Sequence, residues 1–257
     1  MTDDSRGAHL GAGKRPLLIR LGKKMRPSLD ALIARSSRVP NDPALDPAMF
    51  PWTEMLRSNW GAIQSEALAV TQSSDAVPTL REISPDHTRI ATDEGWRSFF
   101  LIGYGQRVER NLARCPRTEK LLRQVPGLNS AFFSVLRPGT HIPKHRGVTK
   151  GLLTCHLGLQ VPRGAGLFMT VGTQTLGWRE GETLVFDDTW HHEVWNGTNG
   201  TRIVLLVQFE RPLAQPGRAI AQAFLAGIRR SAFVKEALKN IDRWQRAFDE
   251  LDQREGS

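Results

Sequence analysis

The sequence predicts a mainly β domain of the sandwich or barrel type, with helices before and after it in the chain. Short apolar segments separated by glycine turns follow one another from Asn129 to Phe209, a spacing typical of all-β sandwiches and barrels. On either side, apolar residues recur every three or four positions, as on one face of a helix. Five of the seven histidines lie in this β stretch: His141, His145, His156, His191 and His192.

We divide the 257 residues into four parts. They are a basic N-terminal tail at 1–35, a helical and loop segment at 36–94, the β core at 95–212, and C-terminal helices at 213–257. A chain of this length can bury a full core without disulfide staples.

The N-terminal tail holds most of the excess positive charge. Seven basic residues and no acidic one lie between Ser5 and Leu29, so that 28 basic residues remain against 26 acidic ones. Because the remainder is close to neutral, we expect no nucleic-acid partner. The composition favours a solvated, partly disordered tail. The alternative is weak contact of residues 14–26 with an anionic membrane surface, through basic and apolar side chains together.

No signal peptide or membrane span is recognisable, and the cysteines are few. We therefore expect a cytoplasmic protein, with peripheral contact at the inner membrane face as the alternative. The apolar run PLLIRLG is interrupted by Arg20, and the strand core IVLLV (203–207) is far shorter than a transmembrane span. Cys115 and Cys155 are too few for a disulfide framework and lack CxxC spacing.

Helices are expected on both sides of the β core. Pro51 should open one, because apolar residues then repeat at helical spacing: Leu56, Trp60, Ile63, Ala67 and Val70. Residues 36–50 and 78–87 carry turn signals and should be loops, and a short helix should run between Pro116 and Pro126. C-terminal to the β core, two apolar faces predict helices packed on it: Ile220, Phe224 and Ile228, and then Val234, Ala237, Ile241, Trp244, Phe248 and Leu251.

The β core should begin with one or two strands in residues 95–105. Further strands are expected at 131–136, 152–161, 167–171, 175–178, 183–186 and 202–209. Jelly-roll barrels built from such strands hold ligands between their two sheets.

His145 and His192 are candidate metal ligands. Divalent iron accepts imidazole and carboxylate ligands, and the common oxygenase arrangement is His-x-Asp on one strand with a distant His on another. In His145-Arg146-Gly147 a glycine stands where the carboxylate would be, and His192 follows several predicted strands later. Two histidines are also compatible with ordinary hydrogen-bonded side chains, so this pattern alone leaves both interpretations open.

Arg202 and Asp188 are further candidates for the site. Arg202 begins an otherwise apolar strand, where a charge must be paired or lie at the edge, and a guanidinium matches a carboxylate ligand. Asp188 precedes His192 by four residues and could orient a metal-bound water or the imidazole. The alternative for Asp188 is an acid that caps the turn.

These motifs resemble the aspartyl/asparaginyl β-hydroxylase family of Fe(II)/2-oxoglutarate dioxygenases. The resemblance runs from about Gly95 to Pro212 and is carried by GW-R-FFL (95–101), RPGTHIPKHRG (137–147), HLGL (156–159), WREGE (178–182), FDDTWHHEVWN (186–196) and TRIVLLV (201–207). Residues 21–60 also look like soluble bacterial members, among them relatives that hydroxylate an acyl chain of lipid A. The resemblance implies a double-stranded β-helix, a cupin-like jelly roll.

The family binds iron through two histidines and no carboxylate, which agrees with Gly147. On this resemblance the site residues are as follows: His145 and His192 hold Fe(II), His191 points away, Asp188 holds an iron-bound water, Ser134 and Arg202 bind the distal carboxylate of 2-oxoglutarate, and His156 lies near the end that chelates iron. Family members usually carry arginine where this chain has Thr154, beside the iron-side carboxylate. We therefore expect weaker 2-oxoglutarate binding unless Lys150 or Arg146 substitutes.

The sequence thus predicts a 2-oxoglutarate-dependent oxygenase with Fe(II), 2-oxoglutarate and O₂ as its cofactor and small co-substrates. Its prime substrate is expected to be the β-carbon of an Asp or Asn residue or a related amino acid, with a lipid acyl chain as the second class. Two alternatives remain: a halogenase, which chloride dependence would reveal, and a non-catalytic β-barrel that senses a carboxylate ligand.

Overall fold

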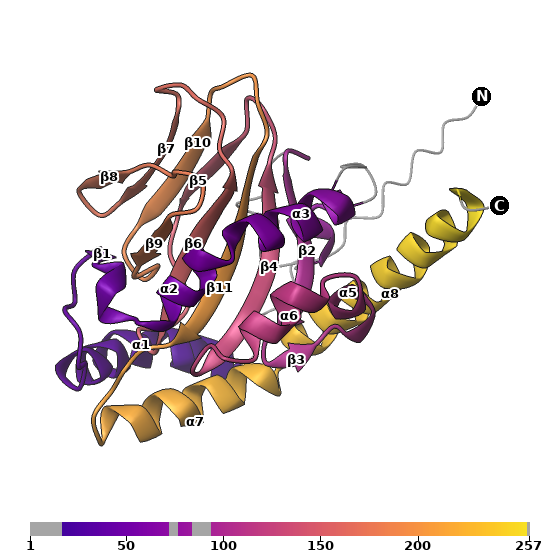
Figure 1. The fold of residues 1–257 in the computed structure, drawn as a ribbon. Coiled ribbons are helices and arrows are strands. Elements are labelled where there is room, and N and C mark those ends of the chain that lie inside the picture. Colours follow the sequence, from indigo (N-terminus) through magenta and orange to yellow (C-terminus); the bar gives the residue numbers. More distant parts are fainter. Residues whose placement is uncertain (1–16, 72–76, 84–93, 256–257) are drawn as a thin grey trace, which may run out of the picture.

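The structure, a computed structural model, describes residues 17–71, 77–83 and 94–255, with side chains from residue 26 to residue 246 of these ranges. Three parts of the sequence predictions lie outside it: residues 1–16 of the tail, residues 84–87 of the expected loop, and the side chains of Phe248 and Leu251. Two β-sheets form the centre, and helices cover the outer face of the larger sheet (Figure 1).

The larger sheet has seven strands in the order β1-β9-β6-β11-β4-β2-β3. Their bounds are β1 Ala44–Leu45, β2 Trp96–Gly103, β3 Gln106–Arg107, β4 Leu128–Leu136, β6 Leu152–Gln160, β9 Thr183–Phe186 and β11 Arg202–Glu210. The smaller sheet has the order β5-β10-β7-β8. Its strands are β5 His141–His145, β7 Leu167–Val171, β8 Gln174–Leu176 and β10 His192–Asn196. Neighbouring strands are antiparallel in both sheets.

The chain passes back and forth between the two sheets from β4 to β11. Strands β4, β6, β9 and β11 belong to the larger sheet, and β5, β7, β8 and β10 belong to the smaller one. Eight antiparallel strands shared between two sheets in this way form a jelly roll. The predicted fold class, mainly β with a jelly-roll core and flanking helices, is confirmed.

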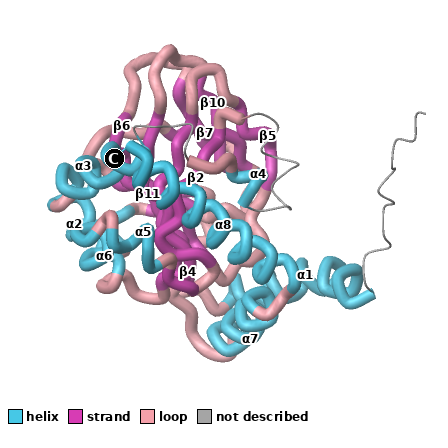
Figure 2. The backbone as a smooth tube through the Cα atoms, turned by 90° about the vertical axis from the view of Figure 1, so that its right-hand side faces the viewer, coloured by secondary structure: helices cyan, strands magenta, loops and turns pink. Residues whose placement is uncertain are grey.

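The helices lie on the outside of the jelly roll (Figure 2). They are α1 Leu17–Arg35, the short 3₁₀ helix η1 Pro47–Met49, α2 Trp52–Ser58, α3 Trp60–Thr71, α4 Leu80–Ile83, α5 Glu109–Ala113, α6 Pro116–Leu122, α7 Gly217–Arg229 and α8 Ala232–Glu255. No helix in the described ranges combines the length and apolar character needed to cross a membrane.

Apolar side chains pack on both faces of the larger sheet. One layer lies under α2, α3 and α6 and includes Leu56, Ile63 and Phe133. The second layer includes Phe132 and Val204 of the larger sheet and Met169 of the smaller one. Because successive side chains of a strand point to opposite faces, odd-numbered residues of β4 and β11 contribute to the first layer and even-numbered ones to the second.

The helix expected after Pro51 is in fact two helices. α2 ends at Ser58, α3 begins at Trp60, and the Asn59 side chain between them donates a hydrogen bond of 2.8 Å to the Met55 carbonyl oxygen. Asparagine competes in this way with the backbone bonds that would continue a helix. Likewise, the expected loop at 78–87 contains the one-turn helix α4.

The buried face of α7 also differs from the predicted one. The residues that pack inward are Gly217, Ala221 and Leu225, whereas Ile220, Phe224 and Ile228 are only half-buried. A Cβ atom at Gly217 would lie 2.3 Å from the Cβ of Ser36, so the close approach of this helix requires a residue without a side chain. The close approach of α7 to Ser36, rather than hydrophobicity alone, therefore decides which face of α7 is buried.

Residues 17–35, where composition suggested a solvated tail, form helix α1. Its C-terminal part packs against α7 through Ile33, which is buried against Leu213 and Ala221. Ala221 also lies against Gly151, which directly precedes β6. The packing of α1 on α7 therefore holds α1 beside the end of the jelly roll where β6 begins.

Candidate functional site

Polar side chains interrupt the apolar inner face of the larger sheet. Ser134 on β4, Thr154 and His156 on β6, and Arg202 on β11 have the even-numbered parity of the inward residues, and all are buried. Their outward neighbours, such as Phe133, are apolar. The sequence therefore places four polar groups between two sheets, where each needs a partner or a ligand.

His145 and His192 face each other across adjacent strands of the smaller sheet. They are paired in register on β5 and β10, and their ring centroids are 4.1 Å apart. Each Nδ1 lies at hydrogen-bond distance from a carbonyl oxygen two residues earlier: 2.8 Å to Pro143 and 3.0 Å to Trp190. A carbonyl oxygen only accepts, so Nδ1 carries the proton and Nε2 keeps its lone pair.

This is the tautomer that a metal-binding imidazole needs, because the second nitrogen is oriented by its own hydrogen bond. Burial lowers the pKa of His192, which favours the neutral ring. Among the residues that the structure describes, no group of three or more His, Cys, Asp or Glu side chains could hold a metal ion. Any metal that these two histidines held would therefore have no third ligand of these residue types in the described part of the chain.

Asp188 occupies the space that a side chain at position 147 would need. A Cβ atom on Gly147 would lie 2.0 Å from Asp188 Oδ1. The two residues are also joined through the backbone, where Gly147 N donates to Asp188 O at 2.7 Å. A carboxylate ligand at position 147 is therefore excluded by packing, and Asp188 supplies the acidic group beside the histidine pair.

The Asp188 carboxyl group is only partly satisfied. Oδ2 accepts hydrogen bonds of 3.3 Å from Thr154 Oγ1 and from Gln208 Nε2. Oδ1 is buried and has no hydrogen-bond partner among the described residues. Burial, and then the nearby Asp187, raise the pKa of Asp188 to about 7, so the group can exist in either protonation state near neutral pH.

His156 presents a buried N–H group. Trp178 Nε1 donates a hydrogen bond of 3.1 Å to His156 Nδ1, so the proton of this ring is on Nε2. Nε2 is buried without a hydrogen-bond partner in the described part of the chain. Burial, followed by the charge of Arg202, lowers the pKa of His156 well below its usual value. His156 is therefore a neutral donor that lacks an acceptor.

Arg202 is a buried cation without an anionic partner among the described side chains. Its side chain is 1% exposed, its Cζ lies 4.9 Å from the Trp178 ring centroid, and Nε and Nη1 have no hydrogen-bond partner there. Burial lowers the pKa of this guanidinium. Such a charge is costly unless a ligand pairs with it, and a carboxylate fits its planar donors.

Ser134 lies near Arg202 on the neighbouring strand. The register pairs Arg202 with Leu136, two residues from Ser134 along β4, so both side chains are on the inner face. Trp96 Nε1 donates a hydrogen bond of 3.0 Å to Ser134 Oγ. Since the oxygen accepts this bond, the hydroxyl proton of Ser134 can be donated to a ligand oxygen.

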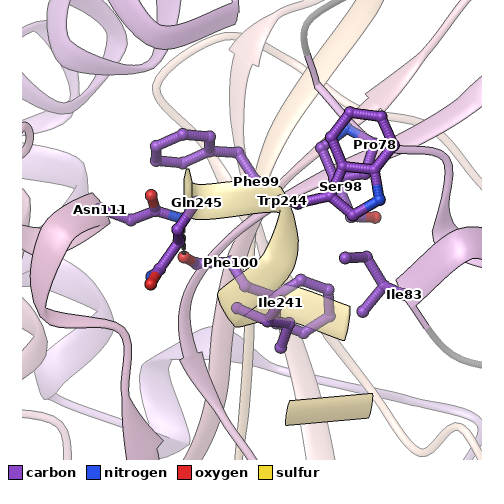
Figure 3. Close-up of a pocket in the computed structure, with 9 residues that line it drawn as sticks. All are labelled: Pro78, Ile83, Ser98, Phe99, Phe100, Asn111, Ile241, Trp244 and Gln245. Atoms are coloured by element: carbon purple, nitrogen blue, oxygen red, sulfur yellow. Dashed lines mark hydrogen bonds between the residues drawn. The ribbon is translucent and has the colours of Figure 1, made fainter. Parts of the chain in front are cut away.

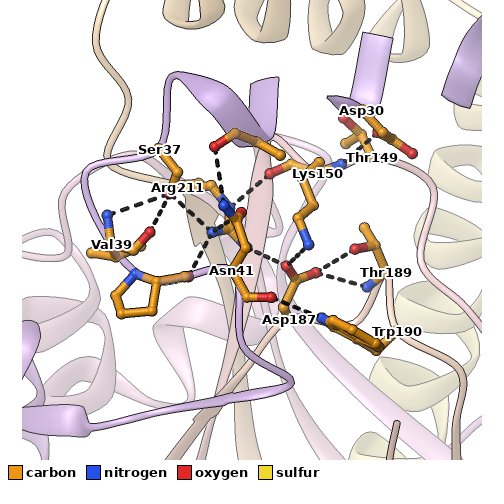
Figure 4. Close-up of polar contacts among 12 residues, drawn as sticks. Asp30, Ser37, Val39, Asn41, Thr149, Lys150, Asp187, Thr189, Trp190 and Arg211 are labelled. Atoms are coloured by element: carbon orange, nitrogen blue, oxygen red, sulfur yellow. Dashed lines mark hydrogen bonds and ion pairs between the residues drawn. The ribbon is translucent and has the colours of Figure 1, made fainter. Parts of the chain in front are cut away.

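A network that the sequence did not predict holds the loop before His192. Asp187 is fully buried, and its Oδ2 pairs with Lys150 Nζ at 2.6 Å and with the Arg211 guanidinium (Figure 4). Its Oδ1 accepts hydrogen bonds from the Thr189 backbone N–H and hydroxyl group. Arg211 also donates to the carbonyl oxygen of Lys150 at 2.9 Å. These contacts tie the loops on either side of the histidine pair together.

The two remaining histidines of the cluster lie outside the site. His191 is exposed, in agreement with the expectation that it points away. His141 stacks on the exposed Trp195 ring at 3.5 Å between centroids, and its Nε2 is 3.3 Å from Glu193 Oε2. His191 directly precedes the inward His192. On β5, His141 has the same parity as His145, but a register shift between His192 and Val194 pairs it with the exposed Trp195.

Two cavities in the described ranges are separate from this site. The smaller, about 20 Å³, lies between β2 and α8 and is bordered by Phe100, Ile241 and Trp244 (Figure 3). The larger, about 310 Å³, lies between the end of β11 and α7, where Arg38 and Arg218 border it. Neither cavity is lined by the histidine pair, so side-chain chemistry rather than cavity size identifies the candidate site.

Residues 57–212 match the family described as Aspartyl/Asparaginyl beta-hydroxylase. The chain belongs to this family. It is 39% identical over 220 residues to the ornithine lipid ester-linked acyl 2-hydroxylase of Rhizobium tropici. The aligned region covers 85% of this chain and 78% of that protein. The chain is 31% identical over 173 residues to the human aspartyl/asparaginyl beta-hydroxylase, and this aligned region covers 64% of this chain but only 22% of that protein.

Both relatives are hydroxylases by name, which supports hydroxylation as the activity of this member of the aspartyl/asparaginyl β-hydroxylase family. Among solved structures, the predicted oxalate decarboxylase of Thermotoga maritima has 12% identity, a TM-score of 0.31, and coverage of 45% of this chain and 80% of that one. The cupin domain of Schizosaccharomyces pombe Cnp3 has 10% identity, a TM-score of 0.32, and coverage of 46% and 66%.

Proposed function

We propose that this protein is an Fe(II)- and 2-oxoglutarate-dependent hydroxylase that acts on an unactivated carbon. One observation carries the proposal: a histidine pair of the metal-binding tautomer shares one barrel interior with a buried arginine that has no anionic partner among the described residues. A divalent metal suits the first feature, and a carboxylate suits the second. 2-Oxoglutarate is a ligand that can satisfy both, since its oxoacid end can chelate the metal and its distal carboxylate is an anion.

His145 and His192 would hold Fe(II) through Nε2. Arg202 and Ser134 would bind the distal carboxylate of 2-oxoglutarate, by charge and by the hydroxyl proton respectively. When bound, iron and 2-oxoglutarate supply the O₂ activation that inserts one oxygen atom into a C–H bond while 2-oxoglutarate becomes succinate and CO₂.

The chain contributes binding and proton control around this chemistry. His156 would donate its Nε2–H to the iron-side carboxylate, whereas the Thr154 hydroxyl group, whose proton goes to Asp188 Oδ2, would hold the Asp188 carboxyl group in place. Asp188 Oδ1 would accept a hydrogen bond from water beside the histidine pair, with a pKa of about 7 that permits proton exchange near neutral pH. The apolar inner layer around Met169 and Val194 would keep bulk water out.

We propose a lipid acyl chain as the prime substrate, in preference to the Asp or Asn side chain ranked first from sequence. The acyl hydroxylase of Rhizobium tropici aligns with 85% of this chain, whereas the human Asp/Asn hydroxylase aligns with 64%. A substrate in a membrane also fits the basic and apolar composition of residues 14–26.

The substrate is tested with purified protein, Fe(II), 2-oxoglutarate and O₂. One reaction receives vesicles containing ornithine lipid, and a parallel one receives Asp- and Asn-containing peptides. Mass spectrometry should find one added oxygen atom on a lipid acyl chain and none on the peptides. Hydroxylated peptide with unchanged lipid would reverse the preference, and neither product with either substrate would refute both substrate classes.

A lipid substrate requires access to the membrane surface, for which we propose residues 14–26. Co-sedimentation should be stronger with anionic than with zwitterionic vesicles and should weaken in high salt. Replacing Lys23 and Lys24 by glutamine should reduce it, whereas the same change at the C-terminal Lys235 and Lys239 should not. Equal loss in both pairs would show that overall charge, rather than this segment, drives the association.

A further inference from the structure

Helix α1 brings a positive charge to the loop that follows His145, the proposed metal ligand at the end of β5. Arg26 Nη2 donates a hydrogen bond to the carbonyl oxygen of Gly147, two residues after His145. Arg26 Nε lies 3.4 Å from Asp30 Oδ2, one turn further along the helix. Asp30 Oδ1 in turn accepts a hydrogen bond of 3.0 Å from the Lys150 backbone N–H. Two side chains of α1 thus fasten this helix to the loop at 147–150.

The metal end of the site is otherwise short of positive charge. His156 is a neutral donor there, the Thr154 hydroxyl proton is donated to Asp188, and Asp188 itself is acidic. The metal would balance the charge of the carboxylate that chelates it, but the carboxylate oxygen that does not bind the metal would still need hydrogen-bond donors in this buried space. Arg202 cannot provide them, because the proposed function assigns its charge to the distal carboxylate.

Three other described cations near the metal end already have partners or lie towards solvent. Lys150 Nζ is 2.6 Å from Asp187 Oδ2, and the buried Arg211 guanidinium pairs with the same oxygen. The side chain of Arg146 is 44% exposed, and its Nη2 is 3.7 Å from Asp30. Neither substitute expected from sequence, Lys150 or Arg146, is therefore poised over the site.

Arg26 is better placed than either. Its side chain is 26% exposed, so its charge is less screened by solvent than that of Arg146. Gly147, whose carbonyl oxygen accepts a hydrogen bond from Arg26, connects it to Asp188: the Gly147 N–H donates to the Asp188 carbonyl oxygen at 2.7 Å, and a Cβ atom on Gly147 would lie 2.0 Å from Asp188 Oδ1. A guanidinium has five N–H donors, and the contacts to Gly147 and Asp30 use two of them.

We propose that Arg26 pairs with the iron-side carboxylate of 2-oxoglutarate and so makes helix α1 part of the cofactor site. This inference rests on the proposed function. It explains how the chain tolerates Thr154, whose hydroxyl group brings no charge. It also makes cofactor binding depend on the docking of α1 against the loop at 147–150.

The test is the dissociation constant of 2-oxoglutarate for full-length protein loaded with Mn(II), measured by calorimetry without turnover. Arg26→Gln keeps an N–H donor for the Gly147 carbonyl and removes the charge. We expect at least about a tenfold loss of affinity, the usual effect of losing one charge-assisted hydrogen bond. Arg35→Gln is the matched control, since it removes the same charge from an exposed position on the same helix and should leave the affinity unchanged.

Rescue separates cofactor binding from a merely structural role of Arg26. Thr154→Arg combined with Arg26→Gln should recover most of the lost affinity, and Arg26→Lys should give an intermediate value. Unchanged affinity in Arg26→Gln, or a double variant as weak as the single one, would overturn the inference. Wild-type protein that binds Mn(II) but no 2-oxoglutarate would instead overturn the proposed function, and the role of Arg26 with it.

Discussion

At the scale of single residues, the site depends on which nitrogen of each imidazole carries the proton. The Nδ1 contacts to Pro143 and Trp190 leave Nε2 of His145 and His192 as the metal-binding atoms. We predict that His145→Ala and His192→Ala each abolish Mn(II) binding in equilibrium dialysis. His191→Ala is the control, because this exposed neighbour should bind metal like wild type. Equal loss in all three variants would contradict the assignment.

Arg202 should be required for function and unfavourable for stability. It is buried with no anionic partner among the described side chains, so removing its charge relieves a desolvation cost. We predict that Arg202→Met raises the free energy of unfolding by about 1–3 kcal/mol in denaturant titrations without ligand. The same variant should lose 2-oxoglutarate binding. A variant that is less stable and still binds the cofactor would contradict both parts.

Asp188 should make stability depend on pH. Its pKa is about 7 in the folded protein and 3.8 as an ordinary aspartate, so the folded state binds more protons between these values. Stability from this group is therefore present below pH 3.8 and is lost as pH rises to about 7. We predict that metal-free wild type loses about 1–3 kcal/mol relative to Asp188→Asn across this window. Parallel pH profiles of the two proteins would contradict the prediction.

Sequence reasoning found most of the residues that the structure brings together: the residue pattern supplied His145, His192, Asp188 and Arg202, and the family resemblance supplied Ser134, Thr154 and His156. In the structure, the alternation of side chains along each strand accounts for the common face of the residues on the larger sheet. Thr154 and His156 share a face for this reason, as do Ser134 and Arg202 on their own strands. Sequence reasoning did not find Arg26, which lies far from the β core in sequence and reaches it only through the packing of α1. The network around Asp187 was also missed, since paired buried charges have no local sequence signal.

At the scale of elements, the contact between α1 and α7 depends on small residues. Gly217→Val would place a Cβ atom 2.3 Å from that of Ser36, which forces the helices apart. We predict a loss of about 1–3 kcal/mol in the free energy of unfolding. Gly227→Ala on the same helix has nothing within 4 Å and should stabilise by about 0.4–1 kcal/mol. Equal effects of the two changes would show that the helix contact is not close-packed.

Elements were predicted well where apolar periodicity is strong and poorly where tertiary contacts decide. The strands at 131–136 and 202–209 and the helix after Cys115 are as expected. Strands β5 and β10, which carry the histidine pair, are short and have mixed polarity, so no alternation identified them. The break at Asn59 and the inward face of α7 likewise depend on side-chain packing.

At the scale of the whole molecule, the jelly roll supplies a rigid frame and the helices complete it. The larger sheet is buried on both faces, by α2, α3 and α6 outside and by the smaller sheet inside. This arrangement allows polar groups on the inner face to be held without solvent. The end of β5, the beginning of β6 and the loop before β10 lie near α1, so the N-terminal helix and the site form one unit.

The measurement that tests the central claim most directly is succinate formation from 2-oxoglutarate by anaerobically purified protein given Fe(II) and O₂. The account predicts succinate from wild type and from His191→Ala, and none from His145→Ala or when either Fe(II) or O₂ is left out. The assay should be run with and without ornithine lipid vesicles, so that dependence on a substrate is also visible. Succinate from His145→Ala at the wild-type rate, or none from wild type under either condition, would contradict the assignment of an iron- and 2-oxoglutarate-dependent hydroxylase.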